Sequence, residues 1–118
     1  MAAPANYFEI IGKDAAKLQD FYRRLFDWEI SPNAEMGGYG FVRDSSGEGS
    51  MGAVGPTLVP GEPTGVRIYC QVEDPQAILD KVVELGGKVV VPVTTIPDMV
   101  TYALYADPEG NVNGIFKG

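Results

Sequence analysis

The sequence predicts a small α+β protein made of two βαβββ modules in tandem. Two observations carry this prediction. The order strand, helix, strand, strand, strand occurs twice along the 118 residues. Asp14 and Asp74, which lie sixty positions apart, each stand where a helix is expected to begin. Because a module of this size buries too little apolar surface to be stable alone, we expect a single domain over residues 1–118.

The first module is expected over about residues 6–55. Its first strand is Asn6–Ile11 (NYFEII), and Asp14 is a good N-cap for the helix that follows. Apolar residues then recur at spacings of three and four from Leu18 to Phe26, which is the period of an amphipathic helix. The three remaining strands are expected at Trp28–Ile30, Tyr39–Arg43 and Ser50–Val54, with a turn at DSSGEG before the last one.

The second module is expected over about residues 66–118, after a linker at about 56–65 that is rich in Pro, Gly and Thr. Asp74 and Pro75 are typical of a helix start, and Gly86 follows the last periodic residue of that helix. Pro92 indicates an edge strand or a bulge. The expected strands are Val66–Val72, Lys88–Val93, Thr101–Tyr105 and Val112–Lys117.

The composition narrows the class of function. Nine basic and sixteen acidic residues give a net charge of −7, which disfavours binding to nucleic acid or to an anionic membrane. No apolar run is long enough to span a bilayer, so we expect a cytoplasmic protein. Histidine is absent, which removes the commonest general base and metal ligand. The one cysteine, Cys70, is expected to be an inert buried thiol.

Side-chain alternation assigns two faces to the first strand of each module. The helix-packed face is expected to hold apolar residues, namely Phe8, Ile10, Val66, Ile68, Cys70 and Val72. The opposite face is expected to hold Tyr7, Glu9 and Ile11 in the first module and Arg67, Tyr69 and Gln71 in the second. Tyr39, Phe41 and Tyr102 are further candidates for this second face.

Three stretches of the chain resemble the glyoxalase/bleomycin resistance/dioxygenase (vicinal oxygen chelate) superfamily. They are FEI…KDAAKLQDFYRRLFDWEI, VEDPQAILDKVVELGGKVV and YADPEGNVNGIF, and together they cover nearly the whole sequence. The resemblance implies that the two modules form a curved, mostly antiparallel sheet enclosing a cleft for a small molecule. It also implies a homodimer.

Members that depend on a metal take ligands from the first and last strands of each module. Counting from the capping aspartates and the turn glycines, the equivalent positions here are Tyr7, Gly52, Arg67 and Gly114. A guanidinium cannot donate a lone pair, and glycine has no side chain to do so. We therefore expect no metal and no other cofactor, and we expect the two glycines to leave space for a ligand.

The resulting hypothesis is a protein that binds a small organic ligand in a metal-free cleft. The residues expected to contact the ligand are Tyr7, Glu9, Arg67, Tyr69 and Gln71. Three alternatives stay open. Glu9 and Arg67 could pair with each other instead of with a ligand. The chain could be an isomerase or lyase with Glu9 as general base, with or without a non-standard metal site. Its cleft could also be vestigial in a subunit that associates with a partner.

Overall fold

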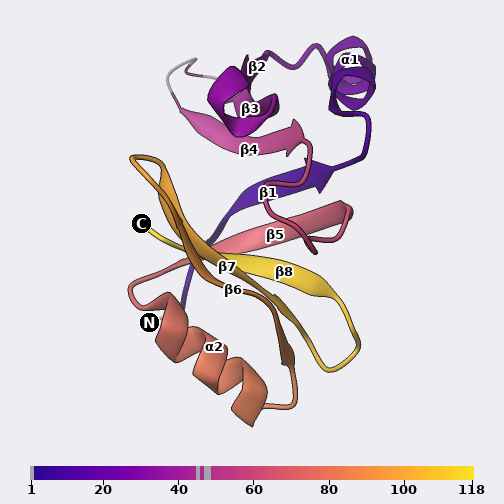
Figure 1. Ribbon diagram of the computed structural model, residues 1–118. Coiled ribbons are helices and arrows are strands. Elements are labelled where there is room, and N and C mark those ends of the chain that lie inside the picture. Colours follow the sequence, from indigo (N-terminus) through magenta and orange to yellow (C-terminus); the bar gives the residue numbers. More distant parts are fainter. Residues whose placement is uncertain (1, 45, 47–48) are drawn as a thin grey trace. The chain divides into compact units, whose positions relative to one another are not determined.

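The computed structural model describes residues 2–44, 46 and 49–118. The chain divides into two compact units, one formed by residues 7–66 and the other by residues 1–6 together with 67–118. We call these the N-terminal unit and the C-terminal unit. Each has one α-helix and one mixed sheet, and the elements of both are labelled in Figure 1.

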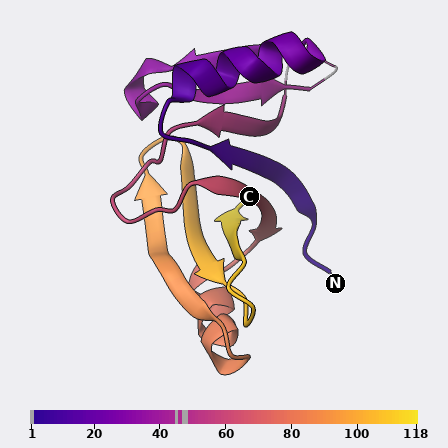
Figure 2. The same cartoon turned by 90° about the vertical axis from the view of Figure 1, so that its right-hand side faces the viewer.

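The N-terminal unit contains a four-stranded sheet in the order β2-β3-β4-β1. β1 is parallel to β4, and the other neighbours are antiparallel. α1 lies across one face of this sheet (Figure 2). The elements are β1 (Ala5–Ile11), α1 (Ala15–Phe26), β2 (Ile30–Asn33), the 3₁₀ helix η1 (Ala34–Met36), β3 (Tyr39–Arg43) and β4 (Ser50–Gly55).

The C-terminal unit repeats this plan, with the strand order β5-β8-β7-β6 and β5 parallel to β8. Its elements are β5 (Gly65–Val72), α2 (Pro75–Glu84), β6 (Lys88–Ile96), β7 (Val100–Ala106) and β8 (Val112–Lys117). The predicted α+β class with two βαβββ modules is confirmed. In the described ranges, neither helix combines the length and the hydropathy that a bilayer crossing requires.

Both helices begin as the sequence indicates. The carboxylate of Asp14 accepts a hydrogen bond from the backbone N–H of Lys17, and that of Asp74 accepts one from Ala77. Each aspartate thereby satisfies one of the free N–H groups of the first helical turn. Pro75 occupies the first turn of α2, where its missing N–H costs nothing.

The strand predicted at Trp28–Ile30 starts later, at Ile30. Asp27 ends α1 in the left-handed region, with φ of 56°, and its N–H donates to the carbonyl of Arg23. The chain leaves the helix through this cap, so Trp28 packs its ring against Phe8 and Tyr22 and does not join the sheet. The turn predicted at DSSGEG lies partly outside the described residues.

Pro92 lies in β6, which is the last strand in the order of its sheet. The register between β6 and β7 shifts between Val91 and Thr94, around this proline. Both the edge position and the irregularity that the sequence indicated are therefore present. An edge strand leaves one side of its backbone unpaired, which is where the missing N–H of a proline is tolerated.

The predicted alternation along β1 is confirmed. Phe8 and Ile10 pack with Leu18 of α1 around buried Ile30, Val42 and Val54. Tyr7 and Ile11 lie on the opposite face, in a cluster with Tyr39 and Ala53. We call this second surface the helix-free face of the N-terminal unit.

The alternation along β5 is only partly as expected. Cys70 and Val72 pack on the core formed by Leu79 of α2 with Ala103 and Ile115. Val66 and Ile68, which were expected to pack there too, are 72% and 49% exposed, so that expectation was wrong. They occupy the first half of the strand, whereas the described core contacts of β5 involve its second half.

Two glycines were expected to leave space for a ligand, but both lie beneath aromatic rings. Gly52 pairs with Phe8, and a Cβ built on it would lie 2.5 Å from the Phe8 ring. Gly114 pairs with Tyr69, and its Cβ would lie 2.2 Å from that ring. The expectation of free space was therefore wrong. Gly52 also lies on the face of Phe8, which packs towards α1, and not on the face of Glu9.

Gln19 joins α1 to the sheet through a buried amide. Its side chain is 4% exposed, and Nε2 donates to the carbonyls of Gly38 at 2.8 Å and Val54 at 2.7 Å. A Cβ on Gly40 would lie 2.5 Å from the same nitrogen, so a glycine is needed there for this approach. One side chain thus links the helix, the turn before β3 and the end of β4.

Replacing Gln19 with leucine should lower the free energy of unfolding by about 1–3 kcal/mol, because two carbonyls lose their donor in a buried place. Urea denaturation measures this change. Gln76→Leu is the matched control, since its amide also donates a hydrogen bond from a helix, to Asp80, but in an exposed position. Equal losses in the two variants would contradict the structural role of Gln19.

Gly114→Ala should destabilise the protein by about 1–3 kcal/mol, because the new methyl group overlaps the buried Tyr69 ring. In a Tyr69→Leu background the same change should cost much less, and a double-mutant cycle by urea denaturation measures the coupling. Additive costs would show that ring and glycine are not coupled.

Candidate functional site

A buried carboxylate lies on the helix-free face of the N-terminal unit. Glu9 of β1 is 2% exposed, and its Oε2 accepts a hydrogen bond of 2.6 Å from the hydroxyl of Tyr39 on β3. The hydroxyl of Tyr39 is in turn 3.0 Å from that of Tyr7, two positions before Glu9 on β1. Three oxygen atoms therefore form a chain from the buried carboxylate to Tyr7, which is only partly buried.

Burial and the neighbouring carboxylate keep both phenols protonated at neutral pH. Burial, opposed by the hydrogen bond with Tyr39 and reinforced by the charge of Glu9, raises the pKa of Tyr7 to about 12. The same two causes, burial first, raise the pKa of Tyr39 further. Tyr39 therefore stabilises Glu9 as a neutral donor, and Tyr7 remains a neutral hydroxyl that can donate or accept.

Apolar side chains surround this polar chain. Ile11, Tyr39 and Ala53 are buried, and Tyr7, Met36, Phe41 and Leu58 pack against them. The rings of Tyr39 and Phe41 meet edge to face, with centroids 5.3 Å apart. Leu58 comes from the segment predicted as a linker, and its N–H donates to Glu62 in the same segment. A hydrogen-bonding group in apolar surroundings can fix the orientation of a small organic molecule.

The other predicted site residues lie on β5 in the C-terminal unit. Arg67 and Tyr69 are 3% and 4% exposed, and the Tyr69 ring meets Phe116 edge to face at 6.5 Å. Gln71 is partly buried, and its Oε1 accepts a hydrogen bond from Asn6. The N–H of Gln71 donates to the carbonyl of Pro4, so residues 4–6 run beside this strand.

The structure thus divides the five predicted residues into two groups. Tyr7 and Glu9 belong to one hydrogen-bonded chain, while Arg67, Tyr69 and Gln71 share one strand of the other unit. Tyr39 was expected only as a further candidate for this face, and its hydrogen bond to Glu9 was not predicted. The alternation Tyr39-Gly40-Phe41 was the available signal, because it places both aromatic rings on one face of β3.

The residues at the family's metal positions do not fit a metal ion. Tyr7 is held neutral in the chain with Tyr39, and Arg67 has no lone pair to donate. Gly52 faces α1, away from the face of Tyr7 and Glu9, and Gly114 lies under the Tyr69 ring, which leaves no room for a larger side chain. Among the described residues, no three His, Cys, Asp or Glu side chains are grouped in a way that could hold a metal.

The chain matches known proteins along nearly its whole length. The family model of the Glyoxalase/Bleomycin resistance protein/Dioxygenase superfamily matches residues 5–115. "Putative glyoxylase CFP32" of Mycobacterium bovis is 30% identical over an alignment of 116 positions that covers 95% of this chain and 44% of that protein. The anthracycline biosynthesis protein DnrV of Streptomyces peucetius is 25% identical over an alignment of 129 positions, gaps included, that covers 98% of this chain and 46% of that protein. The chain therefore spans less than half the length of these relatives.

Solved structures share the fold at low sequence identity. The hypothetical protein BH1468 of Bacillus halodurans has a TM-score of 0.69 at 12% identity, with 100% of this chain and 96% of that chain covered. A methylmalonyl-CoA epimerase of Streptomyces coelicolor has a TM-score of 0.63 at 16% identity, with coverage of 100% and 99%. Together with the family model and the two βαβββ units, these findings show that the chain belongs to the glyoxalase/bleomycin resistance protein/dioxygenase superfamily.

Proposed function

We propose that this protein binds a small organic molecule, without a metal ion, on the helix-free face of the N-terminal unit. The observation that carries the proposal is the chain Tyr7–Tyr39–Glu9, in which a buried carboxylate orients two neutral phenols within an apolar cluster. Tyr7 is the only partly buried member of the chain and also has a side-chain hydrogen bond with Ser50; its hydroxyl is the group we assign to the ligand. Glu9 acts through Tyr39, because its own carboxylate is 2% exposed.

In the C-terminal unit, taken by itself, we propose Gln71 as a group that contacts a small molecule, and we give Arg67 and Tyr69 a supporting role. Gln71 is partly buried, and its Oε1 is already held by Asn6, which fixes the plane of the amide. Its NH₂ group makes no hydrogen bond within the described residues. Arg67 and Tyr69 are 3% and 4% exposed, so they shape and stabilise the face.

An enzymatic role is the second candidate. Glu9 is hydrogen-bonded to Tyr39, which is hydrogen-bonded to Tyr7, so a proton taken from a carbon acid at the Tyr7 hydroxyl can pass along the chain to the buried carboxylate and return. Proton exchange at a carbon next to a carbonyl is the direct test of such a base. Incubation of carbonyl compounds in D₂O, followed by NMR, detects such exchange. Glu9→Gln should abolish it and Gln76→Leu should not, and exchange that survives Glu9→Gln excludes Glu9 as the base.

Two further expectations stay predictions. The superfamily resemblance implies a homodimer, and the composition implies a cytoplasmic protein. Sedimentation velocity on the purified chain tests the first, and fractionation of cells expressing it tests the second.

Tyr7→Phe should weaken binding of any small molecule that stabilises the protein in a thermal-shift screen, by about three- to tenfold, because one hydrogen bond is lost while the ring remains. Titration calorimetry with the compound found in the screen measures the change. Tyr22→Phe is the matched control, since Tyr22 packs on the α1 side of the same sheet. If both variants bind as tightly as the wild type, Tyr7 is not a ligand group.

Elemental analysis of the purified protein should find only substoichiometric zinc, nickel, manganese or iron, because the four family positions offer no adequate donor set. Treatment with EDTA should leave both ligand binding and the melting temperature unchanged. A stoichiometric metal whose removal abolishes binding would refute the metal-free proposal while leaving the fold assignment intact.

A further inference from the structure

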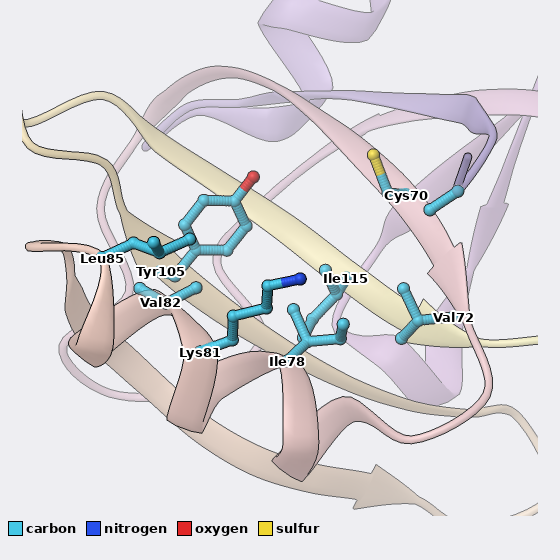
Figure 3. A pocket seen from close by; sticks show the side chains of 9 residues that line it. Cys70, Val72, Ile78, Lys81, Val82, Leu85, Tyr105 and Ile115 are labelled. Atoms are coloured by element: carbon cyan, nitrogen blue, oxygen red, sulfur yellow. The ribbon is translucent and has the colours of Figure 1, made fainter. Parts of the chain in front are cut away.

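The C-terminal unit has a groove between α2 and its sheet, on the face of the sheet that the helix covers (Figure 3). The groove has a volume of about 240 Å³. Successive turns of α2 form one wall, β5 and the N-terminal segment form the other, and β7 and β8 form the floor. The lining residues are Ala3, Cys70, Val72, Ile78, Lys81, Val82, Leu85, Tyr105 and Ile115.

The groove is apolar in its body. Ile78, Val82 and Leu85 follow one another at helical spacing along one side of α2, opposite Val72 of β5. Ile115 at the floor is 2% exposed, so the groove reaches the core of the unit. An engineered apolar cavity of about 150 Å³ binds benzene, whereas sites for drug-sized molecules start near 300 Å³. The groove therefore suits one aromatic ring or a chain of roughly eight carbons.

Two polar groups line this apolar groove. Lys81 extends from α2 along it (Figure 3). In the part of the chain that the structure describes, no carboxylate lies within ion-pair distance of the Lys81 ammonium. Tyr105 adds a hydroxyl, and burial together with the neighbouring Cys70 and Asp107 raises its pKa, so it stays a neutral donor. One cation and one donor beside an apolar surface match a carboxylate attached to an apolar body.

Asp107, an acidic group that neighbours Tyr105, is hydrogen-bonded within its own turn. Asp107 accepts hydrogen bonds from the backbone of Glu109 and Asn111 and from the side chain of Asn111. These bonds, led by those from Asn111, lower the pKa of Asp107. The carboxylate of Asp107 is thus stabilised within the turn, and the Lys81 ammonium remains available to an incoming anion.

We propose that this groove is a binding site for a small amphipathic carboxylate, with the apolar body on Ile78, Val82 and Ile115 and the carboxylate on Lys81 and Tyr105. The site lies on the α2 side of the C-terminal unit, and neither Tyr7 nor Gln71 lines it. It is independent of the proposed function above, and either proposal can fail without the other.

Cys70 was expected to be a buried thiol, but it is only partly buried and lines the groove. As the one cysteine of the chain, it makes the proposal testable. Its alkylation by N-ethylmaleimide, followed by mass spectrometry, should slow saturably with added octanoate and also with 1-octanol. Lys81→Gln should raise the apparent Kd for octanoate about fivefold, the upper range for an exposed ion pair, and leave that for octanol unchanged. Lys81→Arg should retain octanoate binding.

Lys88→Gln is the matched control, since Lys88 is an exposed lysine of the same unit that does not line the groove. Three results would overturn the proposal. Octanoate could fail to protect Cys70 from alkylation, Lys81→Gln could weaken the binding of octanoate and of octanol equally, or Lys88→Gln could have the same effect as Lys81→Gln. A fourth such result is a dimer, detected by sedimentation velocity, in which Cys70 is protected from alkylation without octanoate. A second copy of the chain would then cover the groove.

Discussion

The side-chain alternation of β1 and β5 determines most of what this protein can do. A strand sends successive side chains to opposite faces, so one face can pack under a helix while the other carries chemistry. In β1, Phe8 and Ile10 join the core beneath α1, and this commits Tyr7 and Glu9 to the opposite face. A shift of one residue would exchange the two sets and place a carboxylate under the helix.

Glu9 is therefore a buried carboxylate, and a buried carboxylate needs hydrogen-bonded partners. An isolated carboxylate in an apolar environment is strongly destabilising, and charge-assisted hydrogen bonds offset that cost. Tyr39 supplies one such bond at 2.6 Å, and Tyr7 continues the chain. The same bonds that make Glu9 tolerable also fix the orientation of Tyr7, so the stability of this face and its capacity to bind arise from the same contacts.

The fold could be predicted from the sequence because its signals are local. Capping aspartates, helical periodicity and strand alternation each depend on a few neighbouring residues, and the helix starts and strand order are found where these signals indicate. The misjudged features depend on distant residues. Whether Gly114 is open or covered depends on the rotamer of Tyr69 across the parallel pair. Likewise, the partner of Glu9 comes from β3, thirty positions away, and the groove beneath α2 depends on how a helix lies on a sheet.

The hydrogen bonds between residues 4–6 and β5 have a consequence for how the chain folds as it is synthesised. Asn6 and Gln71 are 65 positions apart in the sequence, yet their side chains are hydrogen-bonded, and the carbonyl of Pro4 accepts from the N–H of Gln71. During synthesis, this segment leaves the ribosome long before its partner strand exists. The β1 residues that follow this segment can pair with β4 before β5, the partner of the segment, has been synthesised. Closing so long a loop is entropically costly and slow, so this contact belongs among the last steps of folding.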